Sequence, residues 1–126
     1  MAAMSRAAQQ RYRLTTPGRR VLRGPKPEVV LGIIEALPRD GDVLLESMDQ
    51  PEVYIQVWLR PDGTYQLELR DGSVDTHVQT RSVFRERVAA AFTSWLEEHS
   101  GDCDAGWRDD FQWKDISGTL SKEPQA

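Results

Sequence analysis

The chain is poor in the residues that build disulfide scaffolds and zinc modules. It has one cysteine, Cys103, and two histidines among 126 residues. One cysteine cannot form an internal disulfide, and these three side chains fall short of the four ligands of a typical zinc module. No apolar run approaches the roughly 20 residues of a membrane helix, and the N-terminus lacks the apolar core of a secretory signal. We therefore expect a cytoplasmic protein that uses no metal, cofactor or membrane.

The composition is nevertheless that of a folding domain. A length of 126 residues corresponds to one domain, and a second core is not expected. Hydrophobic residues make up 39% of the chain and the mean hydropathy is -0.57. Four tryptophans, three tyrosines and three phenylalanines supply bulky groups for a core. The composition thus predicts one small globular domain.

Charge is distributed unevenly along the chain. The net charge is -4, but residues 1–26 carry +7 and no acid, which leaves -11 for the rest. Such a basic segment could contact phosphates, an acidic partner or the acidic face of its own domain. Because it is rich in turn residues, we predict a disordered arm over residues 1–26. The domain is expected over residues 27–116, followed by a frayed polar tail over residues 117–126.

Hydrophobic periodicity indicates helices at both ends of this domain. Apolar residues recur at helical spacing from Pro27 until Pro38 ends the pattern. A second helical stripe begins after Ser82, the expected N-cap, includes Phe84 and Trp95, and reaches His99. The segments between them alternate or are short and apolar, which predicts strands. We expect an edge strand over residues 43–47, a hairpin over 53–70 and a third strand over 75–81.

The hairpin sequence also predicts its register. The loop Pro61-Asp62-Gly63 would pair Arg60 with Thr64, and therefore Val57 with Leu67. The third strand could then place Val78 against Leu67, with His77 opposite Glu68. A shift of two residues would instead place His77 opposite Arg70. The fold class we predict is α+β: an antiparallel three- to four-stranded meander sheet, with the N-terminal helix and the long C-terminal helix packed on one face.

The other face of that sheet is the candidate binding surface. Tryptophan, tyrosine and arginine are enriched in binding hot spots, so this face predicts protein binding. Alternatively, the C-terminal aromatic segment could fold back over it, or it could form the interface of a homodimer. The candidate residues on this face are Tyr54, Gln56, Trp58, Gln66, Glu68, Arg70, His77 and Gln79.

A second candidate is the aromatic and acidic C-terminal segment, with Trp107, Asp109, Asp110 and Trp113. Its acids could attract a partner with a basic surface. A calcium loop is not expected, because the alternating acids, the central glycine and the closing glutamate of that motif are missing. The neighbouring Cys103 lies between two aspartates, which do not favour a reactive thiolate.

Catalytic signatures are weak. A carboxylate such as Glu68 could orient His77 as a general base, but no nucleophile motif or phosphate-binding loop accompanies the pair. A cross-strand ion pair explains the two residues equally well. The second histidine, His99, lies on the apolar stripe near a helix end, where a structural role is the simpler interpretation.

Several of these segments together resemble a known type of protein. They are Tyr54-Ile55-Gln56-Val57, Arg60 to Glu68 around the Pro-Asp-Gly loop, His77 and Gln79, and then Trp95, Trp107 and Trp113. Over residues 43–115 the chain resembles small bacterial α+β proteins of the toxin-immunity type. This resemblance implies a non-catalytic protein that binds one partner tightly and has an acidic surface able to mask a basic active site.

The leading hypothesis is thus a protein-binding domain of the immunity or adaptor kind. One alternative is a nucleic-acid-associated protein that uses the basic arm for phosphates and the sheet aromatics for stacking. Another is a small-ligand binder or an enzyme built around Glu68 and His77.

Overall fold

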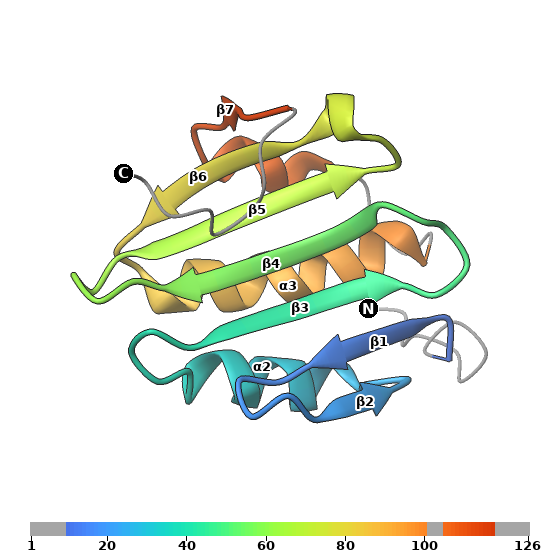
Figure 1. The fold of residues 1–126 in the computed structure, drawn as a ribbon, viewed down its shortest axis with the longest axis horizontal. Helices are drawn as coiled ribbons and strands as arrows, with labels where there is room; N and C mark the ends of the chain where they lie inside the picture. Colours follow the sequence, from blue (N-terminus) through green and yellow to red (C-terminus); the bar gives the residue numbers. More distant parts are fainter. Residues whose placement is uncertain (1–9, 101–104, 118–126) are drawn as a thin grey trace.

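In a computed structural model, residues 10–100 and 105–117 form a seven-stranded antiparallel sheet with two α-helices on one side (Figure 1). The strand order is β2-β1-β3-β4-β5-β6-β7. The strands are β1 (Tyr12–Thr15), β2 (Val21–Arg23), β3 (Asp42–Ser47), β4 (Val53–Leu59), β5 (Tyr65–Asp71), β6 (Val78–Ser82) and β7 (Lys114–Asp115). The helices are α2 (Pro27–Glu35) and α3 (Arg85–His99), with short 3-10 helices η1 (Val74–Thr76) and η2 (Ala105–Asp110).

The expected three- to four-stranded meander is wrong, because the sheet extends further at both edges. Two of the added strands, β1 and β2, come from the segment expected to be a disordered arm. Tyr12 and Leu14 are buried in the core, and Arg13 pairs with Glu46 of β3 at 3.0 Å. Consequently β3 is an interior strand between β1 and β4, not the expected edge. Residues 1–9 and the tail from residue 118 lie outside the described residues.

The central hairpin has the predicted register. Val57 pairs with Leu67 and Ile55 with Leu69. The loop closes through hydrogen bonds from the Arg60 N–H to the Thr64 carbonyl and from the Gly63 N–H to the Arg60 carbonyl. This register keeps the apolar side chains of β4 and β5 on one face, where the helices cover them.

The helices cover that face with their apolar stripes. Val30 and Ile34 of α2 and Phe92 and Trp95 of α3 are fully buried. The N-cap of α3 is Phe84, not Ser82, which ends β6 and accepts the Phe84 N–H through its hydroxyl. In the part of the chain that the structure describes, neither helix combines the length and apolar character that crossing a bilayer requires.

Two glycines are expected to respond in opposite directions to substitution by alanine. Gly63 has a φ of +89°, so a Cβ there is strained, and Gly63→Ala should destabilise the fold by about 1 kcal/mol. Gly32 lies in α2, where a Cβ would meet no atom from outside the helix backbone within 4 Å, so Gly32→Ala should stabilise by about 0.5–1 kcal/mol. Urea unfolding of both variants checks the pair. Equal effects of the same sign would contradict the assigned backbone conformations.

Candidate functional site

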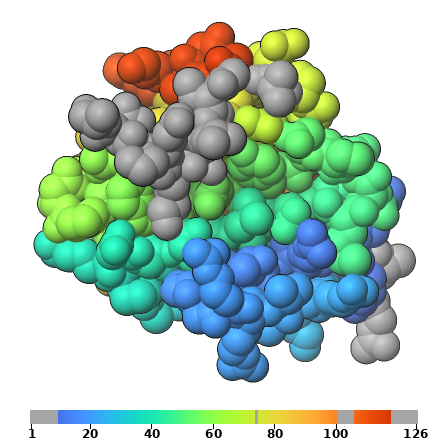
Figure 2. All heavy atoms as spheres, in the orientation of Figure 1, coloured from blue at the N-terminus to red at the C-terminus, as the bar shows by residue number. Residues whose placement is uncertain are grey.

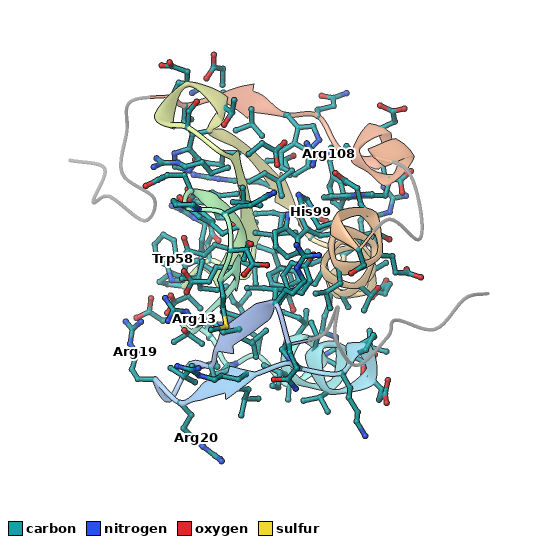
Figure 3. All side chains as sticks on the ribbon, turned by 90° about the vertical axis from the view of Figure 1, so that its right-hand side faces the viewer. Arg13, Arg19, Arg20, Trp58, His99 and Arg108 are labelled. Carbon is teal, nitrogen blue, oxygen red and sulfur yellow. The ribbon has the colours of Figure 1, made fainter. Side chains whose placement is uncertain are left out.

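The face of the sheet turned away from the helices carries the candidate site. Along β4, alternate residues point to the core, which leaves Tyr54, Gln56 and Trp58 half-buried on the opposite face. Figure 3 shows Trp58 on the side away from the two helices, and Figure 2 looks onto this face, with atoms of β3 and β4 across its middle. We call it the helix-free face: Tyr54, Gln56, Trp58, Arg60, Gln66, Glu68, Arg70, His77 and Gln79. All eight candidates expected on one sheet face belong to it.

Two arginines lie over the aromatic rings of this face. The guanidinium carbon of Arg60 is 4.9 Å from the centre of the Trp58 ring, and that of Arg70 is 5.7 Å from the Tyr54 ring. These distances fit cation-π contacts. The Trp58 indole N–H also donates to an Asp40 carboxylate oxygen at 2.9 Å. The orientation of each aromatic ring is therefore constrained by polar neighbours.

Both arginines are held by a chain of hydrogen bonds on β5 and β6. Arg60 donates to the side-chain oxygen Oε1 of Gln66 at 2.7 Å, and the side-chain nitrogen Nε2 of Gln66 donates to Glu68 at 2.7 Å. Glu68 also contacts His77 Nε2 at 2.8 Å, and Arg70 donates to His77 Nδ1 at 2.9 Å. The chain ends where Arg70 pairs with Glu52. We call these residues the buried polar chain: Arg60, Gln66, Glu68, His77, Arg70 and Glu52.

The middle of the buried polar chain is shielded from solvent. Gln66 is 6% exposed, Glu68 2% and His77 0%. A guanidinium can only donate, so Arg70 requires His77 Nδ1 to accept, which assigns the ring proton to Nε2, where it faces Glu68. Both ring nitrogens are thereby used within the protein. This arrangement leaves His77 no lone pair with which to act as a base on a substrate.

The contact between β5 and β6 follows the second of the two registers considered from sequence. Leu69 pairs with Val78 and Glu68 with Gln79, so the pairing of Val78 with Leu67 is wrong. The shift arises in the connection, where η1 is closed by a capping box between Ser73 and Thr76. His77 then precedes β6 and lies between Glu68 and Arg70, in contact with both.

The C-terminal aromatic residues do not cover the helix-free face. The Trp107 indole N–H donates to Glu98 of α3, and the Trp113 indole N–H donates to the Arg108 carbonyl, both at 2.8 Å. Both rings pack against the core beside α3, as the contact between η2 and α3 requires. Asp109 and Asp110 are exposed. The aromatic side chains of this segment thus pack beside α3, and its acidic side chains face the solvent. Cys103 lies outside the described residues.

A second polar cluster, which the sequence did not reveal, joins β5, α3 and η2. Arg108 donates to Asp71 at 2.6 Å and to Glu98 at 2.9 Å. His99 donates through Nδ1 to the Trp95 carbonyl at 2.9 Å, and its Nε2 lies 3.8 Å from Asp71. The structural interpretation of His99 therefore agrees with its contacts. No spacing rule connects these residues, because they come from three separate elements.

These contacts shift two pKa values. The interaction with His99, followed by Arg108, lowers the pKa of Asp71 to about 2, although burial opposes the shift. Burial alone would lower the pKa of His99, but Asp71, the Trp95 carbonyl and Glu98 together raise it above its ordinary value of 6.5. Asp71 and His99 are therefore both charged near pH 5.

The stability contributed by this pair is expected to depend on pH. The stability that Asp71 contributes is fully present above pH 3.8 and declines as the pH falls through its lowered pKa of about 2. That of His99 is complete below 6.5 and is lost as the pH rises through its raised pKa. The free energies of unfolding of the wild type and Asp71→Asn, measured in urea, should therefore differ most between pH 3.8 and pH 6.5. The difference should be smaller at pH 3 and at pH 9. A difference that stays constant over this range would contradict the assignment.

Within residues 10–100 and 105–117, no three histidine, cysteine, aspartate or glutamate side chains gather in a way that could hold a metal ion. No family model, curated protein or solved structure matches the chain.

Proposed function

We propose that this chain is a non-catalytic, cytoplasmic protein-binding domain of the immunity or adaptor kind, and that it binds its partner through the helix-free face. The observation that carries this proposal is the pairing of Trp58 with Arg60 and of Tyr54 with Arg70. Tryptophan, tyrosine and arginine are the residue types that most often dominate binding energy. Here they lie together on β4 and β5, with Arg60 directly after the end of β4.

The buried polar chain supports this proposal by fixing the arginines before a partner arrives. A free arginine side chain loses rotamer entropy when it is immobilised in an interface, at a cost of about 0.5–1.5 kcal/mol. Arg60 and Arg70 are already held, by Gln66 and by Glu52 and His77. A rigid sheet that presents constrained aromatic rings and arginines suits tight binding to one partner.

The acidic surface of the C-terminal segment indicates the charge of the partner. Asp109 and Asp110 of η2 and Asp115 of β7 are exposed beyond β6, at one edge of the sheet. A partner with a basic surface would gain long-range attraction from these acids. Its association rate should therefore fall as salt is added, while the contacts at Trp58 maintain the complex.

The alternative of an enzyme or ligand site at Glu68 and His77 is less well supported. Both side chains are buried, and each is engaged by other members of the buried polar chain. Both side chains hold arginines in place, and this structural role explains why polar groups are buried here without assigning them a reaction.

A capture experiment with matched variants tests the proposal. The full chain is immobilised, exposed to cell extract of the source organism, and compared with Trp58→Ala and Phe84→Ala. Phe84 is 48% exposed at the start of α3, so its removal deletes an aromatic ring elsewhere on the surface. We expect one protein to bind in stoichiometric amount to the wild type and Phe84→Ala and to be lost with Trp58→Ala. Equal retention by Trp58→Ala, or no stoichiometric protein on the wild type, would contradict the proposal.

A further inference from the structure

The hairpin formed by β1 and β2 carries a cluster of exposed cations. We call Arg19, Arg20, Arg23 and Lys26 the basic hairpin residues; all four are exposed, and no acidic partner is found for them within the described chain. Figure 3 shows Arg19 and Arg20 pointing away from the body of the protein. Two neighbouring arginines differ: Arg13 of β1 pairs with Glu46, and Arg11, which precedes β1, pairs with Asp49. The uncompensated charge is thus concentrated on β2 and its flanks.

The same segment forms an edge of the sheet. No strand in the described residues pairs with β2 on the side away from β1. The Gly24 N–H bonds to the Tyr12 carbonyl and the Arg20 carbonyl accepts from Thr16, so even-numbered residues face β1. By the alternation of an antiparallel ladder, the N–H and C=O groups of Val21 and Arg23 point to the open edge. Val21 is 53% exposed.

The charge determines which strand can occupy this edge. A second copy pairing through β2 would bring its own arginines to within about 5 Å of these, the spacing of neighbouring strands, and like charges at that distance repel. Short, cationic edge strands are a known means of preventing such self-pairing. An acidic strand would instead be attracted, because its carboxylates would neutralise Arg19, Arg20 and Arg23. The edge therefore disfavours its own copy and favours an acidic strand.

We propose that the open edge of β2 binds an acidic, extended segment of another protein as an added strand. Backbone hydrogen bonds at Val21 and Arg23 would supply the ladder, and the basic hairpin residues would supply the selectivity. A nucleic acid could use the charges but has no repeating N–H and C=O groups to extend the ladder. The site is distinct from the helix-free face, and its occupation does not require the function proposed above.

The test uses the full chain, labelled with nitrogen-15, and a capped eight-residue peptide in which Asp and Val alternate. Binding should shift the amide signals of Val21 and Arg23 and slow their hydrogen exchange. The variant Arg19→Gln/Arg20→Gln/Arg23→Gln should raise the Kd about tenfold or more. Its control, Arg81→Gln/Arg85→Gln/Arg87→Gln, removes the same charge from exposed positions elsewhere and should leave the Kd nearly unchanged.

A further variant separates the strand from the charge. Val21→Pro removes one outward N–H while keeping every arginine, and should weaken peptide binding about as much as the arginine variant. Circular dichroism confirms that each variant is folded. Absence of peptide binding, unchanged affinity in Val21→Pro, or stronger binding of an eight-residue oligothymidylate than of the peptide would each overturn the proposal.

Discussion

Replacing Glu68 with alanine is expected to lower the free energy of unfolding by about 3–5 kcal/mol. Glu68 accepts hydrogen bonds from both Gln66 and His77, at 2.7 and 2.8 Å, and is 2% exposed. Its removal leaves two buried donors without an acceptor, and leaves Glu52 as the one carboxylate of the buried polar chain that still pairs with Arg70. Water cannot replace these bonds fully, because the side chains around them are buried. Urea unfolding followed by circular dichroism measures the loss.

Two further substitutions separate burial from charge. Glu46 lies on the same face, and its ion pair with Arg13 is partly exposed, so Glu46→Ala should cost no more than about 1 kcal/mol. Glu68→Gln keeps an oxygen for His77 but presents an amide N–H₂ to Gln66, and should fall between the two alanine variants. If Glu68→Ala costs no more than Glu46→Ala, the buried polar chain does not contribute to the fold as described.

Replacing Trp95 with alanine is expected to cost about 3–5 kcal/mol, as for large aromatic side chains in a core. Trp95 is fully buried on α3. Its ring lies 5.6 Å from that of Tyr12 on β1 and 4.3 Å from that of His99. The cavity left by alanine would therefore loosen both the contact of α3 with β1 and the position of His99. Thermal and urea unfolding both report this effect.

The matched controls for Trp95 are Trp95→Phe and Phe84→Ala. Within the described residues the Trp95 indole N–H has no hydrogen-bond partner, so phenylalanine removes ring volume without breaking a hydrogen bond seen there and should cost much less than alanine. Phe84 is 48% exposed, and its removal should change the stability by about 0.5 kcal/mol or less. Similar losses for Trp95→Ala and Phe84→Ala would show that α3 does not pack on the sheet in this way.

The elements that could be predicted from sequence are those with a long, regular pattern. The hairpin of β4 and β5 has seven residues in each strand, strict alternation and a Pro-Asp-Gly loop, and these fix its register. The strands β1, β2 and β7 have four, three and two residues, too few for a periodic signal. In β1 the alternation of Tyr12 and Leu14 with polar residues was present, but the surrounding arginines favoured an interpretation as a disordered arm.

The candidate site was predictable only in part, for a similar reason. Alternation along β4 and β5 places Tyr54, Trp58 and Glu68 on one face without any knowledge of distant contacts. The position of His77 depends on the length of the connection through η1, which the sequence left open between two registers. The cluster of Asp71, His99 and Arg108 depends on how α3 and η2 pack, which no local pattern records.

The central claim is that the helix-free face binds a protein partner through its aromatic and arginine residues. The most direct test is the affinity of the captured partner, measured by titration calorimetry, for the wild type, Trp58→Ala and Phe84→Ala. We predict that Trp58→Ala raises the Kd by about 30-fold or more, which corresponds to a hot-spot loss of about 2 kcal/mol, whereas Phe84→Ala changes it less than about twofold. A Kd for Trp58→Ala equal to that of the wild type, with the variant fully folded, would contradict the account.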